Sequence, residues 1–340
     1  MHCTEALEKQ ALNAGINKNR KEEFTMKKHI KNLALLGFIV TGLIVGFNKL
    51  VNVISNMNDH LPVGKGKYFN WKYGDIYYTK TGHGKPLLLI HNLDVCSSAY
   101  EWTKVVRKLS RTNTVYALDL LGCGRSDKPN LTYSNYLYVQ LLNDFIKKVI
   151  GSKTDVVATG DSFSFVIMAS QMEEDNFNKI IGVSPCDIYE MSKMPGRRKN
   201  FLKFLLDSPI FGTFIYNIET NRKRITEKAV NDYFHKPYLV SKEMINAYYK
   251  GAKNYDGHGK YLLASIKSHY TNINITRAVE NTNQSICLIG GKEHPYMNEI
   301  ISEYRELNAA IEEAYVAGTN YLPQLESPEK FVELIQILIG

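Results

Sequence analysis

The feature that most limits the fold of this chain is a strand-like run that ends in a sharp turn and continues as a helix-like run. Residues 156–159 (VVAT) are apolar and β-prone, Gly160 follows them, and Ser162 stands two residues later beside Phe163 and Ser164. Small residues at this spacing are typical of a tight strand-to-helix turn, because neighbouring backbone and side chains come close together there. The segment therefore indicates a sheet whose strands lead directly into helices.

Other apolar runs alternate with helix-like segments along the rest of the chain. Residues 68–73 and 75–79 alternate like an antiparallel hairpin with Gly74 near its turn. The buried-strand runs are residues 87–90, 115–119, 156–159, 180–183, 286–289 and 314–317. This alternation predicts an α/β fold with a doubly wound, mostly parallel sheet.

The alternation stops between residues 188 and 272, which are helix-like and rich in Tyr, Lys and Asn. We predict that 188–272 is a helical cap inserted at the C-terminal edge of the sheet, where α/β folds bind ligands. The core then consists of residues 68–187 and 273–340. Aromatic side chains of the cap either line a lipophilic pocket or pack its helices together.

The N-terminal region carries an uncharged apolar stretch at residues 33–47 (LALLGFIVTGLIVGF). We predict a transmembrane anchor at 33–54 with Lys49 reaching the interface, a polar basic tail at 1–32 and a linker at 55–67. Lysine and arginine before the span predict a cytoplasmic N-terminus and a C-terminal domain outside the cell membrane. The alternatives are a cleaved signal peptide and a buried core helix; the lack of a following A-x-A site favours the uncleaved anchor.

Composition excludes several classes of protein. An apolar content of 44% argues against disorder, and the net charge of +8 comes from scattered basic residues without a nucleic-acid-binding motif. The five cysteines form neither a C-x-x-C pair nor a zinc spacing. We therefore predict no metal, no cofactor and no nucleic acid partner, and a basic surface that is either simply solvated or attracted to anionic membranes.

Four landmarks together resemble the α/β-hydrolase superfamily, over residues 68–338. The strand that ends at His91, the loop 119–129 (DLLGCGRSDKP), the turn at Ser162 and the segment 318–329 (GTNYLPQLESPE) match the family patterns His-Gly, D-x-x-G-x-G-x-S, G-x-S-x-G and G-H-x-x-x-x-E-x-P. The chain looks most like the capped group that includes esterases, haloalkane dehalogenases and pheophytinase-like hydrolases. The resemblance implies a small lipophilic or ester ligand.

The resemblance assigns roles to several residues of the turn and its surroundings. Ser162 would be the nucleophile, and the backbone amides of Leu93 and Phe163 would form the oxyanion hole. His91 is interpreted as a loop-structuring residue beside the pocket. Asn92 replaces the family's glycine, and it either crowds the oxyanion hole or adds an amide donor.

The partners that a serine needs differ from the family pattern. The family's histidine aligns with Asn320, which cannot accept and return a proton at neutral pH. His294 stands at the position of the acid, and Asp187 is an alternative acid with nothing obvious to orient. Two functions therefore remain open: a membrane-anchored serine hydrolase of an ester or related acyl bond with an unorthodox base such as His294, and a catalytically inactive homologue that binds a ligand or partner.

Overall fold

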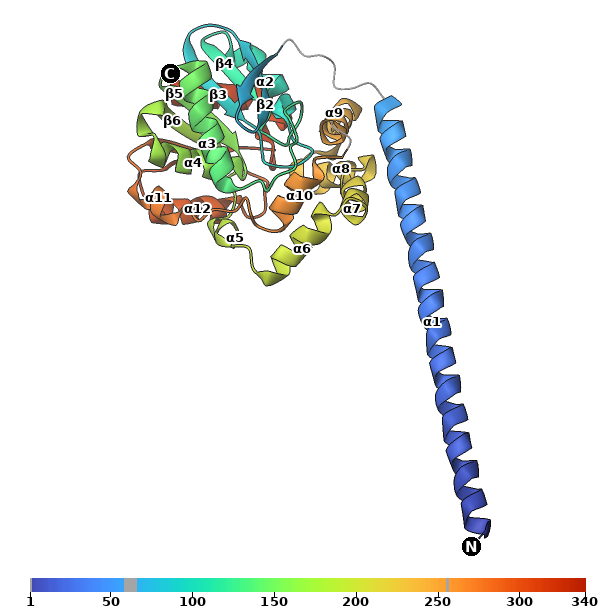
Figure 1. Ribbon diagram of the computed structural model, residues 1–340. Coiled ribbons are helices and arrows are strands. Elements are labelled where there is room, and N and C mark those ends of the chain that lie inside the picture. The colour runs from blue at the N-terminus through green and yellow to red at the C-terminus, as the bar shows by residue number, and fades with distance from the viewer. Residues whose placement is uncertain (1, 58–65, 255–256) are drawn as a thin grey trace. The chain divides into compact units, whose positions relative to one another are not determined.

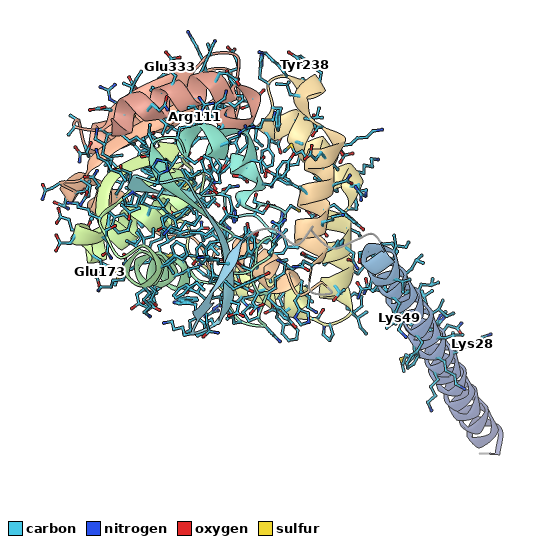
Figure 2. The ribbon with its side chains drawn as sticks, turned by 90° about the horizontal axis from the view of Figure 1, so that it is seen from above. Lys28, Lys49, Arg111, Glu173, Tyr238 and Glu333 are labelled. Atoms are coloured by element: carbon cyan, nitrogen blue, oxygen red, sulfur yellow. The ribbon has the colours of Figure 1, made fainter. Side chains whose placement is uncertain are left out.

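The computed structural model describes residues 2–57, 66–254 and 257–340, and these form two compact units, residues 1–50 and 51–340. The first unit is most of one long helix, α1 (His2–Met57). Its segment Thr25–Ser55 contains an 18-residue window with a mean hydropathy of 2.0 and is long and apolar enough to cross a membrane. Lys28 precedes the apolar stretch and Lys49 lies near its end (Figure 2).

The helix α1 is longer than the sequence indicates. Residues 2–25, expected to be part of a polar tail, continue the helix, because nothing between them and the apolar stretch breaks it: the first proline of the chain is Pro62. The predicted linker at 55–67 lies largely outside the described residues.

The second unit is built on an eight-stranded sheet in the order β1-β2-β4-β3-β5-β6-β7-β8. β1 pairs with β2, and β2 with β4, in antiparallel fashion, whereas every other pair is parallel. The strands are β1 (Lys67–Trp71), β2 (Gly74–Thr81), β3 (Lys85–Ile90), β4 (Asn113–Leu118), β5 (Thr154–Thr159), β6 (Phe177–Val183), β7 (Ser285–Gly291) and β8 (Glu312–Val316). The predicted doubly wound, mostly parallel sheet is confirmed.

Helices cover both faces of the sheet, which gives the core two layers. Leu88 and Ile90 of β3 face one layer, formed with α3 (Asn135–Phe145), α4 (Ser162–Met172), α11 (Thr276–Asn281) and α12 (Met297–Leu307). Leu87 and Leu89 of the same strand face the other layer, formed with α2 (Thr103–Leu109) and α14 (Pro328–Ile339). Strands buried on both faces are continuous apolar runs for this reason. Short helices complete the core: η1 (Ala99–Trp102), η2 (Ile146–Ile150), η3 (Glu174–Asn176) and α13 (Pro323–Glu326).

The chain between β6 and α11 is helical throughout its regular elements. It contains α5 (Ile188–Ser192), α6 (Arg197–Asp207), α7 (Phe211–Glu219), α8 (Arg222–Lys228), η4 (Ala229–Tyr233), η5 (Pro237–Leu239), α9 (Lys242–Lys253) and α10 (Lys260–Lys267). We call this segment the cap. Figure 1 shows α6–α9, yellow to orange, along one edge of the domain rather than over the middle of a sheet face. The loops at the C-terminal ends of β3 and β5 meet the cap, so the candidate site lies there.

Candidate functional site

The turn after β5 places its strained residue at position 160. Gly160 has a φ of +56°, a left-handed conformation that glycine adopts without the steric penalty of a side chain. Its N–H donates to the carbonyl of Val183, and its own carbonyl accepts from the N–H of Phe163 at 3.1 Å. In a nucleophile elbow the strained residue is the one that presents the nucleophile. This chain has glycine at that residue.

Ser162 lies two residues further, as the first residue of α4. Its side chain is fully buried, and its hydroxyl donates to the backbone carbonyl of His91 at 2.6 Å. The prediction that this hydroxyl is held clear of the backbone is therefore wrong. Ser162 instead acts as the small residue that lets α4 approach the end of β3 closely, and its hydroxyl satisfies a buried carbonyl.

Two side chains fill the space into which a side chain at position 160 would point. A Cβ built on Gly160 would overlap the hydroxyl of Tyr321 and the side-chain oxygen of Asn92. That Asn92 oxygen also accepts the N–H of Asp161 at 3.2 Å. The amide that follows the strained residue is the family's oxyanion donor, so in this chain a side-chain carbonyl occupies the place of a substrate oxygen.

The predicted oxyanion donors are accordingly not both available. The N–H of Phe163 is used within the turn, where it donates to Gly160, so its assignment is wrong. Leu93 is buried in the loop after β3. Of the two interpretations of Asn92, crowding of the oxyanion hole agrees with the structure.

The C-terminal loop brings Tyr321, and not Asn320, to the turn. The ring of Tyr321 stacks on Tyr233 with centroids 5.4 Å apart, and its hydroxyl lies beside Gly160. The backbone N–H of Asn320 donates to Glu326 at 2.6 Å. In the pattern G-H-x-x-x-x-E-x-P, counting back five residues from Glu326 gives Tyr321 as the histidine position. The assignment to Asn320 is thus displaced by one residue, and the correct residue, a tyrosine, is equally unable to act as the base.

The other two candidate partners are in different places. His294, in the loop after β7, has its ring 6.4 Å from that of Tyr321, and its Nδ1 accepts the N–H of Tyr296 at 3.3 Å. Burial lowers its pKa. Asp187 caps the N-terminus of α5 by accepting the N–H of Glu190 at 2.9 Å, which is a structural role. Neither residue has a hydrogen bond to Ser162 among those that the described chain forms.

His91 structures the loop after β3, as predicted. Its Nε2 accepts the N–H of Leu120 at 3.0 Å, so the proton of the neutral ring resides on Nδ1, which donates to the carbonyl of Asn92 at 2.7 Å. Burial lowers the pKa of the ring and keeps it neutral. Both ring nitrogens are occupied, so His91 has no free atom for proton transfer.

Glu101 of η1 belongs to the site, although nothing in the motif pattern points to it. Its side chain is 1% exposed, and its carboxylate accepts the N–H of Asn92 at 3.1 Å and the hydroxyl of Tyr248 at 3.3 Å. Tyr248 lies on α9, so this carboxylate connects the cap to the loop after β3. A buried acid three residues after a buried serine pair (Ser97-Ser98) is not a distinctive sequence signal, so the motif analysis did not identify Glu101.

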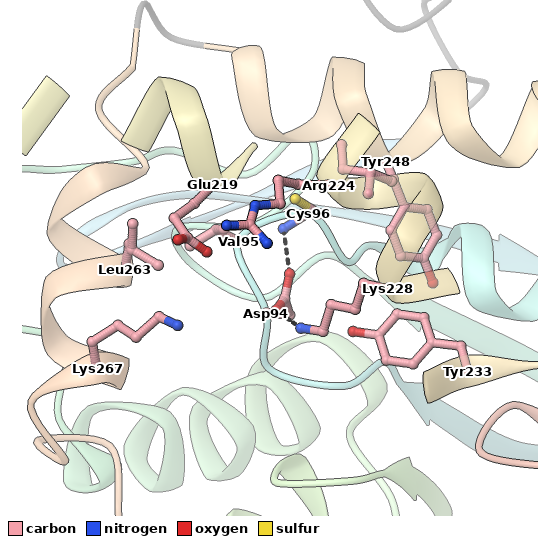
Figure 3. Close-up of a pocket in the computed structure, with 11 residues that line it drawn as sticks. Asp94, Val95, Cys96, Glu219, Arg224, Lys228, Tyr233, Tyr248, Leu263 and Lys267 are labelled. Atoms are coloured by element: carbon pink, nitrogen blue, oxygen red, sulfur yellow. Dashed lines mark hydrogen bonds and ion pairs between the residues drawn. The ribbon is translucent and has the colours of Figure 1, made fainter. Parts of the chain in front are cut away.

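A small cavity of about 80 Å³ lies between the cap and the loop after β3 (Figure 3). Its lining is largely charged or aromatic. The residues are Asp94, Val95, Cys96, Glu219, Arg224, Ile225, Lys228, Tyr233, Tyr248, Leu263 and Lys267. Asp94 lies centrally and forms an ion pair with Lys228 at 2.7 Å, while Lys267 and Glu219 lie on one side of it and the two tyrosines on the other. Charged side chains therefore share the lining of this cavity with apolar and aromatic ones.

The Asp94–Lys228 pair leads to a testable expectation. Burial alone raises the pKa of Asp94, but the Lys228 ammonium, with smaller contributions from the Cys96 N–H and Lys267, outweighs burial, and the net pKa is lowered. A lowered folded-state pKa means that the stabilisation is present above the unfolded pKa and is lost as the pH falls. We expect Lys228→Met to reduce the free energy of unfolding by about 1 kcal/mol at neutral pH, because the pair is partly exposed, and by less near pH 3. Urea denaturation at both pH values measures this, and an equal loss at both would contradict it.

No group of three His, Cys, Asp or Glu side chains that could hold a metal ion occurs within residues 2–57, 66–254 and 257–340. The cysteines of the domain, Cys96, Cys123, Cys186 and Cys287, are free thiols, and burial raises the pKa of each. They are therefore inert thiols rather than nucleophiles.

The sheet order, the crossover helices, the cap and the strand-to-helix turn define an α/β-hydrolase fold with a cap. The model of the alpha/beta hydrolase family matches residues 87–334, and the chain belongs to this family. Over 71 residues it is 37% identical to the 2-hydroxy-6-oxo-6-(2'-aminophenyl)hexa-2,4-dienoic acid hydrolase of Metapseudomonas resinovorans. That segment covers 21% of this chain and only 24% of the relative.

Solved structures agree on the fold. A serine hydrolase involved in carbazole degradation superposes with a TM-score of 0.65 at 17% identity, covering 81% of this chain and 98% of the other. A carboxylesterase from Bacillus subtilis superposes with a TM-score of 0.62 at 13% identity, covering 88% and 98%. At these identities the likeness shows the fold alone.

Proposed function

We propose that this chain is a membrane-anchored, catalytically inactive α/β hydrolase that serves as a ligand-binding module. The observation that carries this proposal is Gly160: the strained residue of the turn has no side chain, and Tyr321 and Asn92 occupy the volume that a nucleophile and an oxyanion would need. The other reading, a serine hydrolase acting through Ser162, requires a hydroxyl that is exposed, and this one is buried and hydrogen-bonded to His91.

The size of the expected loss of turnover supports an inactive protein. Removing a nucleophile or its base from a catalytic triad lowers turnover by roughly 10⁴–10⁶-fold. Here the nucleophile position is Gly160, the base position is Tyr321 and the acid position is His294, so no two neighbouring groups can exchange a proton in the usual way. Membership of a family that contains hydrolases does not outweigh the absence of nucleophile, base and acid from these three positions.

The binding role rests on the cavity between the cap and the core. It lies where α/β folds bind ligands, against the loop after a parallel strand. Asp94 and Lys228 neutralise each other, whereas Arg224, Glu219 and Lys267 line the remaining wall (Figure 3). A small ligand that has both an apolar body and a charged group suits this mixed lining.

The anchor rests on α1. Its segment Thr25–Ser55 has the length and hydropathy of a membrane span, and a span of this kind near the N-terminus is either an anchor or a signal sequence. We favour the anchor because no small-residue cleavage site follows it. The basic residues before the span favour a cytoplasmic N-terminus, with the α/β domain on the outer side of the cell membrane.

A fluorophosphonate probe tests the absence of catalysis. We expect no covalent labelling of the full chain in detergent, and p-nitrophenyl ester turnover that is the same for the wild type, Ser162→Ala and the matched control Ser164→Ala. Ser164 is the neighbouring elbow serine, and its hydroxyl donates to the carbonyl of Asp161. A contaminating esterase gives equal rates in all three preparations, so only a difference between variants reports on this chain.

Labelling of Ser162, or a rate that falls in Ser162→Ala and not in Ser164→Ala, would overturn the proposal and restore the serine hydrolase. Peptide mapping after the probe identifies any other labelled residue, which would overturn it as well.

A further inference from the structure

The outer surface of the cap carries an apolar patch that no part of the described chain covers. Five side chains form it, and we call them the cap patch: Met194, Phe201, Phe204, Leu205 and Phe211, which are 59%, 63%, 70%, 37% and 49% exposed. Phe201, Phe204 and Leu205 lie at i, i+3 and i+4 of α6 and therefore share one face of that helix. α7, which begins with Phe211, packs against α6. Exposed phenylalanines clustered in this way mark an interaction surface rather than scattered surface residues.

Basic residues border the cap patch. Arg197, Arg198 and Lys199 form the first turn of α6, and this turn contains no acid. Residues 190–215 contain five basic residues and two acids: Glu190, which is paired with Lys193, and Asp207, which is paired with Lys203 at 2.6 Å. The surface therefore combines aromatic side chains with a net charge of +3.

The position of the arginines is unfavourable for the helix itself. The N-terminal turn carries the positive end of the helix dipole, so cations there destabilise α6 rather than cap it. A local conflict of this kind is expected where a residue serves function rather than folding. An anionic surface outside the protein would compensate both the dipole and the clustered charge.

The length of the tether points to a membrane as that surface. α1 ends at Met57 and β1 begins at Lys67, so the ten intervening Cα–Cα steps span at most about 36 Å. A domain of this length has a radius of gyration of about 19 Å. If α1 crosses a bilayer, the domain stays within about one diameter of it, and a weak docking surface then acts at a high effective concentration.

We propose that the cap patch docks onto the surface of the anionic bilayer that α1 crosses, with Phe201, Phe204 and Phe211 entering the interface and Arg197 and Arg198 contacting lipid headgroups. Phenylalanine and leucine beside lysine and arginine are the composition of helices that lie in a membrane interface. This inference rests on the anchor in the proposed function, and it does not depend on whether the domain is catalytic.

Quenching by brominated lipids tests the docking with the full chain. The chain has two tryptophans, Trp71 and Trp102, both buried in the core, and they provide a constant background. The chain with Phe204→Trp is reconstituted into phosphatidylcholine vesicles that contain phosphatidylglycerol and acyl chains brominated near the headgroup. We expect the emission of the introduced tryptophan to fall about twofold, because side chains of interfacial helices enter this region.

A matched control places tryptophan on another face. Ile337 of α14 is 72% exposed, much like Phe204, but α14 packs on the sheet layer with α2 and not on the cap. Ile337→Trp is expected to show no quenching. Adding Arg197→Glu and Arg198→Glu to Phe204→Trp, or omitting phosphatidylglycerol, is expected to restore most of the emission.

The outcomes separate the two proposals. Release of the chain from the vesicles by alkaline carbonate would overturn the anchor and the docking that rests on it. Retention in the vesicles without quenching of Phe204→Trp would overturn the docking alone, as would equal quenching of Ile337→Trp. The emission of Phe204→Trp could instead shift to the blue without quenching, by an amount that grows with the protein-to-lipid ratio. This result would show that a second copy of the chain covers the cap patch, and it would also overturn the docking.

Discussion

Gly160→Ala is expected to lower the free energy of unfolding by about 3 kcal/mol, an unusually large effect for one methyl group. Part of the loss comes from the backbone, because φ is +56° and a left-handed conformation costs an L-residue about 1–2 kcal/mol. The rest comes from overlap of the new Cβ with the hydroxyl of Tyr321 and the side-chain oxygen of Asn92. Urea denaturation followed by tryptophan fluorescence measures the change.

Two further variants separate these contributions. Gly151→Ala introduces the same methyl group at a φ of +74°, where nothing lies within 4 Å of the new atom, so it reports the backbone contribution alone. In a Tyr321→Phe background the hydroxyl is absent, and Gly160→Ala is expected to cost about 1 kcal/mol less than in the wild type. Equal losses for Gly160→Ala and Gly151→Ala would show that the elbow is open and that the proposed blockage is wrong.

The fold was predictable because its determinants are local. Strands such as β3 and β5 are buried on both faces and are therefore continuous apolar runs, and the turn between β1 and β2 contains the glycine that the hairpin needs. The extent of α1 was not predictable from hydropathy, because residues 2–25 are polar without periodicity and yet contain no proline.

The site was predicted less well, because a backbone angle decides which residue of the turn occupies the position of the nucleophile. Gly160 and Ser162 both satisfy the small-residue requirement of the turn, and only the φ of Gly160 shows which of them occupies the strained position. The loop after β8 was misassigned for a related reason: Asn320 and Tyr321 are adjacent, and aligning from Gly318 rather than from Glu326 shifts the match by one residue. The volume shared by Gly160, Asn92 and Tyr321 joins three segments that are distant in sequence, so no local pattern reveals it.

The second large effect is expected for the pH dependence of stability at Glu101, a carboxyl group that is buried and forms no ion pair within the described residues. Burial raises its pKa to about 7, more than the hydrogen bonds from Asn92 and Tyr248 lower it. Between about pH 4.5 and pH 7, Glu101 is therefore protonated in the folded protein and ionised in the unfolded chain. The stabilisation from this group is fully present below pH 4.5. As the pH rises through 7, the free energy of unfolding falls by about 3 kcal/mol.

Glu101→Gln isolates this effect, since glutamine is neutral at every pH. Asn92 and Tyr248 donate to different oxygens of Glu101, and glutamine keeps only one of these acceptors because its amide NH2 group only donates. We therefore expect the free energy of unfolding of Glu101→Gln minus that of the wild type to be about 3 kcal/mol higher at pH 8 than at pH 4.5, because only the wild type is destabilised as the pH rises. Burial also raises the pKa of Asp161, to about 6, but that contribution is common to both proteins and cancels in the difference. Urea denaturation at the two pH values provides the comparison, and a difference that stays constant would show that folding does not raise the pKa of Glu101.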